Sequence, residues 1–283
     1  MRSANTIILT AVAMLAFAAN SVLCRLALGQ GLIDAASFTA VRVVSGAAVL
    51  GLILLLRKDR AQAAPDWRSV ITLFIYMAFF SFAYLSLPAG TGALVLFGCV
   101  QLTMFIVALK SGENFSAISW AGLALAMAGL IYLVSPGLTA PNPLGAGLMA
   151  IAGIAWGLYS LIGRSATDPV RATAYNFIYS VPLVIVTSLI FIADFQVSMR
   201  GASLAAASGA IASGIGYVIW YVALRGLRAT SAATVQLSAP VIAAIGGVIL
   251  LSEEVTPRLL FASAATLGGI ALVLGQRADK GSN

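Results

Sequence analysis

The chain opens with the apolar stretch TIILTAVAMLAFAANSVLCRLAL over residues 6–28, in which Arg25 is the only charged residue. A helix needs about 20 mostly apolar residues to cross the hydrocarbon core of a bilayer, and this stretch is long enough. The same composition continues along the sequence: 61% of the 283 residues are hydrophobic and 9% are charged. A soluble domain carries about 25% charged residues. We therefore expect this chain to fold in a membrane.

Breaks that are charged or rich in Pro and Gly divide the sequence into ten candidate spans. They cover residues 6–28, 34–56, 69–88, 91–109, 117–134, 144–163, 172–192, 203–224, 230–251 and 258–275. Each apolar run is continuous and lacks the alternation of a lipid-facing strand, which favours helices over a barrel. The predicted fold class is an all-α, polytopic membrane protein without an extramembrane domain. No cleavable signal is expected, because Arg2 precedes an apolar run of spanning length.

Basic residues predict the orientation, since short cytoplasmic loops collect Lys and Arg. With the N-terminus inside, the outer side receives only Arg25, Arg200 and Arg258, and Arg42 lies within a span. The inner side receives Arg2, Arg57, Lys58, Arg60, Arg68, Lys110, Arg164, Arg171, Arg225, Arg228, Arg277 and Lys280. Both termini are then cytoplasmic, as an even number of spans requires. Because the charge is scattered among short loops, the net charge of +7 does not predict nucleic-acid binding. Arg25, near the outer interface, is expected to snorkel toward water.

The two halves of the chain resemble each other in register. Residues 17–25, FAANSVLCR, align with residues 156–164, WGLYSLIGR, at an offset of 139. Residues 91–93 align with 230–232 at the same offset, and residues 113–116 align with 253–256 at 140. Each half, 1–137 and 138–283, holds five spans, and because five is odd the second must enter the membrane from the opposite face. An inverted repeat of this kind places a binding site near the midplane and suits alternating access.

These segments carry a family resemblance. The motifs are an aromatic residue with Asn or Tyr early in each half, Ala40-Val41-Arg42, Thr230-Ser231-Ala232-Ala233 and Leu251-Ser252-Glu253-Glu254-Val255-Thr256-Pro257. Together they resemble the EamA branch of the drug/metabolite transporter superfamily over essentially the whole chain. The aromatic content is similar, more loosely, to that of YddG-type amino-acid exporters. The resemblance implies a ten-helix exporter or facilitator of small metabolites with a central cavity built from both repeats. The first half departs from the pattern at Gly92, Leu94 and Gln101.

Missing residue types exclude several functions. The chain has no histidine, and none of its nine acidic residues lies deep within a predicted span. A proton relay in a membrane usually needs a buried carboxylate or imidazole. A zinc site or a Ser-His-Asp hydrolase needs ligands or a base that this chain lacks. We therefore expect no enzymatic activity, no catalytic residue, no metal and no cofactor, and transport without proton coupling.

Polar groups within the spans are the first candidates for a binding site. Arg42 is the one charge near mid-membrane, where a cation is costly unless other groups satisfy it. It either caps helix carbonyls and fixes packing, or faces a cavity and attracts a substrate carboxylate. Asn20, Gln101, Asn176 and Gln236 are the buried amides. They either join helices by hydrogen bonds or line a cavity, and depth favours Asn20 and Gln101.

Aromatic residues are the second group of candidates. Tyr76, Phe80 and Tyr84 recur every fourth residue and share one face of the third span. Trp156 and Tyr159 share a face of the sixth span, and Tyr217, Trp220 and Tyr221 share a face of the eighth. Such stripes pack against lipid or other helices as readily as they line a cavity. Tyrosine hydroxyls favour the cavity because lipid cannot satisfy them.

The predicted substrate-binding residues are Asn20, Arg42, Tyr76, Phe80, Tyr84, Gln101, Trp156, Tyr159, Tyr217, Trp220 and Gln236. Aromatic faces and amides suit amino acids, including aromatic ones, or aromatic organic cations. The primary hypothesis is a carrier of the bacterial inner membrane, surrounded by lipid, that exports such metabolites down their gradient; the direction comes from the resemblance. A multidrug exporter of organic cations, a passive small-solute channel and a non-transporting subunit are the alternatives. A monomer is slightly favoured over an oligomer.

Overall fold

A computed structural model describes residues 2–57, 65–112, 115–137, 140–163, 166–224, 227 and 235–280. The helices are α1 (Arg2–Gly29), α2 (Ala35–Leu56), α3 (Trp67–Ala83), α4 (Ala89–Lys110), α5 (Ala117–Val134), α6 (Pro143–Gly163), α7 (Pro169–Ile190), α8 (Met199–Ala207), η2 (Ser208–Ile215), α9 (Gly216–Leu224), α11 (Ser238–Leu251) and α12 (Pro257–Lys280), with the short 3₁₀ turn η1 (Ile192–Asp194). Between the described residues the only β pairing is the isolated bridge of Ile33 with Val197. The all-α prediction is therefore confirmed for the described part of the chain.

Seven of the described helical segments are long and apolar enough to cross a membrane. They are α1, α2, α4, α5, α6, α7 and the segment Met199–Ala223. Three more apolar helices are shorter: Trp67–Ala83, Ser238–Leu251 and Pro257–Val273. All ten occupy the regions that the hydropathy pattern predicts for the ten spans. The structure thus has the helices of a multi-pass membrane protein.

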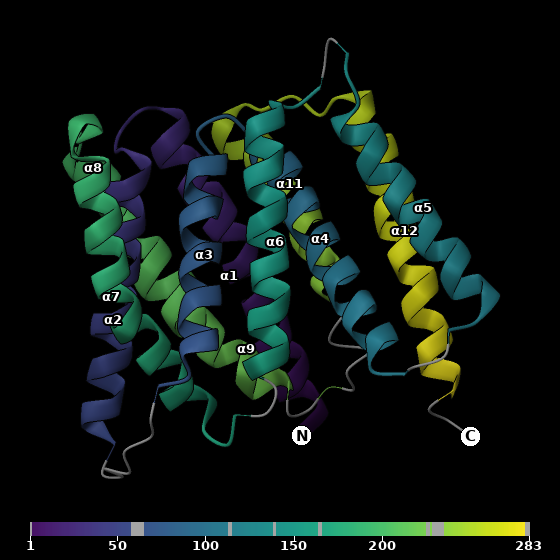
Figure 1. The fold of residues 1–283 in the computed structure, drawn as a ribbon, viewed down its shortest axis with the longest axis horizontal. Coiled ribbons are helices and arrows are strands. Elements are labelled where there is room, and N and C mark those ends of the chain that lie inside the picture. The colour runs from purple at the N-terminus through teal and green to yellow at the C-terminus, as the bar shows by residue number, and fades with distance from the viewer. Residues whose placement is uncertain are drawn as a thin grey trace.

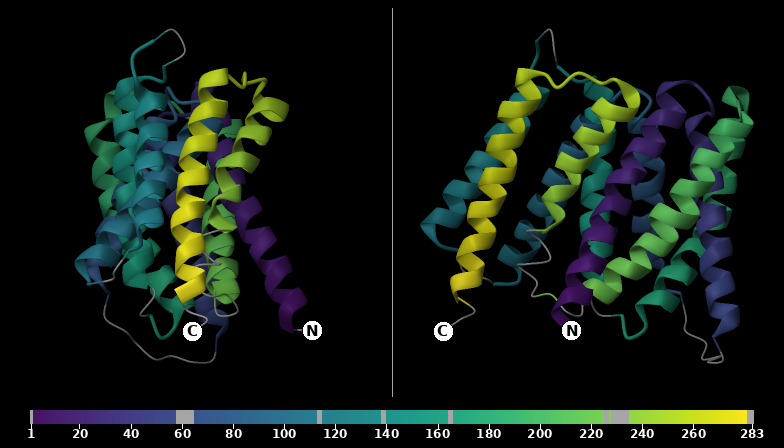
Figure 2. Two further views of the ribbon diagram at one scale, coloured as in Figure 1. Left: turned by 90° about the vertical axis from the view of Figure 1, so that its right-hand side faces the viewer. Right: turned by 180° about the vertical axis from the view of Figure 1, so that it is seen from behind.

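The chain runs back and forth along the bundle, and both of its ends lie on the same side (Figure 1). We call this side the terminal end and the opposite side the distal end. The helices α2, α4 and α6 end at the terminal end, and α1, α3, α5 and α7 end at the distal end. Turning the molecule shows both ends of the chain on one side in each view (Figure 2).

Helix packing brings the two halves of the chain together. α2 packs against α7, α3 against α6, α1 against α9, and α4 against both α6 and α11. α5 and α12 form a pair at one edge of the bundle (Figure 1). Glycines allow the close approach of this last pair. A Cβ at Gly122 would lie 2.6 Å from the backbone oxygen of Gly269, and a Cβ at Gly129 would lie 2.8 Å from the backbone nitrogen of Thr266. The small residues therefore pack within one chain.

The eighth predicted span is not a regular helix. It is built from α8, the π-helical turn η2 and α9 in succession. Gly209 is required within η2, because a Cβ there would collide with the backbone oxygen of Arg42 in α2. A π-turn inserts one residue into a helix and often occurs at functional sites. It changes which side chains of this segment face the centre of the bundle.

The ninth span also differs from its prediction. The helix α11 begins at Ser238, and Pro240 stands in its first turn, where a missing amide donor costs no helical hydrogen bond. Residues 235 and 236 are also helical and residue 237 is a turn, so Pro240 follows a break in the helical path of the ninth span. Residues 228–234, which include the motif 230–233, lie outside the described residues, as do Glu113, Asn114 and Arg164 of the repeat alignment.

Candidate functional site

Aromatic rings from both halves of the chain meet at the centre of the bundle. Phe17 of α1 lies 6.0 Å from Trp156, 5.9 Å from Tyr217 and 5.7 Å from Trp220, measured between ring centroids. Trp156 of α6 also lies 4.7 Å from Tyr76 and 4.9 Å from Tyr217. All five side chains are buried. Tilted and edge-on contacts of this kind are favourable between aromatic rings, so the rings form one packed layer.

The hydroxyl group of Tyr76 joins this layer to polar side chains. It accepts hydrogen bonds from Asn20 Nδ2 at 3.4 Å, from Arg42 Nη2 at 3.2 Å and from the Tyr217 hydroxyl at 3.3 Å. The other end of the Asn20 amide, Oδ1, accepts from Ser208 Oγ at 2.5 Å. These contacts connect α1, α2, α3, η2 and α9. Buried polar groups need such partners, and here the partners come from both halves of the chain.

Arg42 is fully buried beside this network. Its Nε donates to Ser213 Oγ at 3.2 Å, and its guanidinium carbon lies 5.3 Å from the ring centroid of Tyr76 and 4.9 Å from that of Phe80. Its Nη1 has no hydrogen-bond partner among the described residues. Among the described residues, its hydrogen bonds go to hydroxyl groups and none goes to a helix carbonyl. A buried guanidinium with an unused donor is costly.

The aromatic and polar side chains surround a very small cavity. Its walls are Phe17, Asn20, Tyr76, Phe80, Leu96, Phe97, Trp156 and Tyr217. The volume of the cavity is about 10 Å³. This is enough room for one water molecule. We call these eight residues, with Arg42, Ser208, Ser213 and Trp220, the central cluster. In this conformation the described side chains of the central cluster are packed closely together around this cavity.

The structure separates the eleven predicted site residues into groups. Asn20, Arg42, Tyr76, Phe80, Trp156, Tyr217 and Trp220 belong to the central cluster. Tyr84 lies at the distal end of α3, where its hydroxyl donates to the Ala89 carbonyl at 3.3 Å. Tyr159 lies nearer the terminal end and accepts from Asn176 Nδ2 at 3.4 Å. Gln101 and Gln236 are both buried away from the cavity walls. The Nε2 of Gln101 has no partner among the described residues.

Five residues of the central cluster were not predicted from the sequence: Phe17, Leu96, Phe97, Ser208 and Ser213. Phe17 precedes Asn20 by three positions and Phe97 precedes Gln101 by four, so helical spacing from the predicted amides identifies both. The serines carry no such signal. They stand five residues apart, and the π-turn between them directs Ser208 to α1 and Ser213 to α2.

A second cavity, which we call the terminal pocket, opens at the terminal end between α3, α6, α7 and α9. Its volume is about 220 Å³. Asp168, the N-cap of α7, lines it and is bonded to Arg57 at 3.1 Å and to Arg171 at 3.7 Å. Partial burial opposes ionisation of Asp168, but the backbone bond from Arg171 and the Arg57 guanidinium outweigh it, so the pKa of this carboxyl is lowered.

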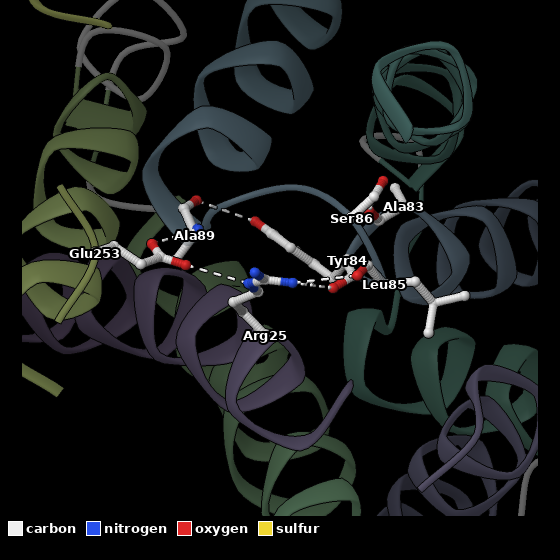
Figure 3. A network of polar contacts seen from close by, with 7 residues as sticks. All are labelled: Arg25, Ala83, Tyr84, Leu85, Ser86, Ala89 and Glu253. Carbon is white, nitrogen blue, oxygen red and sulfur yellow. Dashed lines mark hydrogen bonds and ion pairs between the residues drawn. The ribbon is translucent and has the colours of Figure 1, made fainter. Parts of the chain in front are cut away.

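The distal end is held by a polar network that includes both halves of the chain (Figure 3). Arg25 Nε lies 3.2 Å from Glu253 Oε1, and Arg25 Nη1 donates to the carbonyls of Tyr84 and Leu85 at 3.1 and 3.2 Å. Glu253 Oε2 accepts from the Ala89 amide at 2.8 Å. Arg25 therefore reaches the distal end as expected, but its guanidinium binds protein acceptors and its side chain is only 23% exposed. We call this network the distal latch.

No group of three or more Cys, Asp or Glu side chains that could hold a metal ion occurs among the described residues. Cys24 is buried and Cys99 is half-buried, and both are free thiols.

Comparisons with known proteins give the family. Residues 143–275 match the model of the EamA-like transporter family. An uncharacterized protein of Pseudomonas aeruginosa is 48% identical over 278 residues, covering 98% of this chain and 97% of that protein. An uncharacterized transporter of Bacillus subtilis is 24% identical over 249 residues, covering 84% of this chain and 83% of that one.

Two further matches concern location and fold. An uncharacterized inner membrane transporter of Escherichia coli is 28% identical over 134 residues, which is 47% of this chain and 38% of that protein. A crystal structure of 21% sequence identity has the same fold with a TM-score of 0.67, covering 96% of this chain and 98% of that chain. With its apolar helices and these relatives, the chain is a multi-pass membrane protein that belongs to the EamA-like transporter family.

Proposed function

We propose that this transporter carries small amino acids, including aromatic ones, out of a bacterial cell across the inner membrane by alternating access. The observation that supports it best is Arg42, whose buried guanidinium faces aromatic rings and retains an unused N–H donor at Nη1. A substrate carboxylate satisfies that donor, and the rings of Tyr76 and Trp156 pack against an aromatic or apolar side chain. The cation therefore serves both packing and binding.

The closed centre favours a carrier over a pore. A channel needs a continuous polar path, whereas about 10 Å³ remains free between the bulky rings of the central cluster. Substrate must therefore separate these rings in order to enter. In the state described here the distal latch is formed and the terminal pocket is open, which corresponds to a carrier that receives substrate from the terminal end.

Helix pairing supports two inverted repeats, 1–137 and 138–283. In such a repeat α2 corresponds to α7, α4 to α11 and α5 to α12, and each of these pairs packs together. The contact of α3 with α6 corresponds to that of α9 with α1, and both occur. The basic residues Arg57, Lys110 and Arg171 lie next to the terminal ends of their helices. The positive-inside bias therefore favours a cytoplasmic location for that end.

Counterflow in proteoliposomes tests this function. Vesicles loaded with an unlabelled aromatic amino acid should accumulate the labelled one, with saturation, and an imposed pH gradient should not be required. Trp156→Ala should abolish counterflow while the protein remains folded in detergent. Wild-type flux that never saturates would favour a channel, and uptake that requires a pH gradient would contradict the facilitative mechanism. Transport of organic cations without amino-acid transport would favour the multidrug exporter.

A further inference from the structure

The terminal pocket has the size and chemistry of a second binding site. It runs from the exposed residues Asp66 and Thr167 to the buried side chains of Tyr159 and Asn176. Its volume of about 220 Å³ far exceeds the 10 Å³ at the centre. The pocket therefore offers space for a small organic molecule in the state in which the central cluster is closed.

The walls of the terminal pocket combine aromatic rings with carboxylates. Three tyrosines line it, Tyr159, Tyr175 and Tyr221, together with the carboxylates of Asp66 and Asp168. Arg171 also lines the pocket and pairs with Asp168, so Asp66 supplies the charge that remains for a ligand. Tyrosine faces attract cations. An organic cation therefore finds both ring faces and negative charge in this pocket, and this combination is absent from the central cluster, where the only charge is that of Arg42.

The two carboxylates differ in how far their charge is neutralised. Asp168 is paired with Arg57 and Arg171. Asp66, the N-cap of α3, accepts from the Arg68 amide at 3.0 Å and from Ser69 Oγ at 3.1 Å. No ion pair joins Asp66 to a basic residue of the described ranges. A carboxylate has about four acceptor positions, so Asp66 can accept further hydrogen bonds from a ligand.

The inner end of the pocket adjoins the central cluster. The ring of Tyr159 lies 5.5 Å from that of Trp156, measured between centroids, and Trp156 lines the central cavity. Asn176 holds the Tyr159 hydroxyl from α7. One layer of side chains thus separates the terminal pocket from the centre, and a molecule bound in the pocket is next to the site that it must reach.

We propose that the terminal pocket is a second substrate site that binds the ammonium group of small organic amines, amino acids among them. The ammonium lies at Asp66, and the tyrosine faces enclose the body of the molecule. This inference rests on the proposed transport function, because the pocket receives the substrate before the central cluster opens. It adds a selection for positive charge that the central cluster cannot make.

Equilibrium binding to the purified full-length protein tests the proposal. The probes are tyramine, tyrosine and 3-(4-hydroxyphenyl)propionate, which share one ring and differ in charged groups. Asp66→Asn keeps a side chain that caps helices well and removes the charge. It should weaken tyramine and tyrosine binding about fivefold, the effect of a partly exposed charge pair. Asp194→Asn, at the distal end, is the matched control and should bind as the wild type does.

Unchanged tyramine affinity in folded Asp66→Asn protein would overturn the proposal, and so would propionate binding as tight as that of tyramine. Thermal unfolding of each variant verifies that it is folded. Wild-type counterflow is measured separately. A wild type that binds tyramine at Asp66 and shows no counterflow refutes the transport function and retains the amine site. Equal counterflow by the wild type and the Asp66→Asn variant would show that the amine site is not a step in transport. The proposed carrier function would still stand in that case.

Discussion

Neutralising Glu253 should open the distal end of the transporter. The distal latch joins α1, the connection between α3 and α4, and the segment after α11 through Arg25 and Glu253 (Figure 3). Glu253→Gln keeps an acceptor for the Ala89 amide and removes the charge that attracts Arg25. The perturbation therefore isolates the ion pair from the rest of the network.

The magnitude follows from the exposure of the pair. The side chains of Arg25 and Glu253 are 23% and 15% exposed. Fully exposed pairs contribute up to about 1 kcal/mol, and removal of one partner from a fully buried pair costs about 3–5 kcal/mol. An intermediate value of about 2 kcal/mol corresponds to a shift of roughly 30-fold in the ratio of open to closed forms.

Cys24 reports the opening, because it neighbours Arg25 on α1 and is 0% exposed. In a Cys99→Ala background, a thiol reagent should label Cys24 up to about 30-fold faster in the Glu253→Gln protein than in its parent, if opening is fast relative to labelling. Glu254→Gln changes the adjacent exposed carboxylate and should label like the parent. Equal labelling of the Glu253 and Glu254 variants would refute the latch. High salt should accelerate labelling of the parent, since salt screens a partly exposed pair.

Three further predictions concern packing, charge and the central hydroxyl. Gly269→Ala should lower the free energy of unfolding in detergent by about 1–3 kcal/mol, because its Cβ would lie under 3 Å from backbone atoms of α5; Gly268→Ala, with nothing within 4 Å, is the control and should unfold like the wild type. Asp168 has a lowered pKa in the folded state, so its charge stabilises the protein above the usual carboxyl pKa and the contribution is lost as pH falls through the lowered value. Asp168→Asn should therefore be less stable than wild type at pH 7 in thermal unfolding, with a difference that shrinks below pH 4 or so; a difference independent of pH would contradict the ion pairs. Tyr76→Phe removes the acceptor of three buried hydrogen bonds. It should lower the free energy of unfolding by about 1–3 kcal/mol and raise the KM of counterflow. Wild-type values of both quantities would show that the Tyr76 hydroxyl contributes neither to stability nor to binding.

Hydropathy and helical spacing predict much of this architecture, because both act within one segment. Each predicted span lies on a helical region, and the stripe of Tyr76 and Phe80 faces the centre as its four-residue spacing predicts. Tyr84 continues the stripe in sequence but lies at the end of α3, where the helix has finished. A periodic pattern locates a face of a helix, and the depth along that face depends on where the neighbouring helices end.

Contacts between distant segments are less accessible to sequence reasoning. Arg25 and Glu253 are 228 residues apart, and hydropathy within α1 predicts only that Arg25 reaches water. The π-turn is hidden for a related reason. The run SGAIASGI over 208–215 reads as an ordinary apolar helix, and it is the contact of Gly209 with the backbone of Arg42 that sets its geometry. Both features depend on tertiary packing, which a single segment does not encode.

The two proposed sites together discriminate amino acids from simpler ions. The terminal pocket offers a carboxylate, Asp66, and the central cluster offers a guanidinium, Arg42, so the two levels select opposite charges. An amine without a carboxylate binds the pocket but leaves Arg42 Nη1 unsatisfied, and opening the central rings then has no electrostatic compensation. A carboxylate without an ammonium group lacks the first contact. Only a molecule that carries both charges gains at both levels, so tyrosine should exchange through the carrier whereas tyramine should bind and block it.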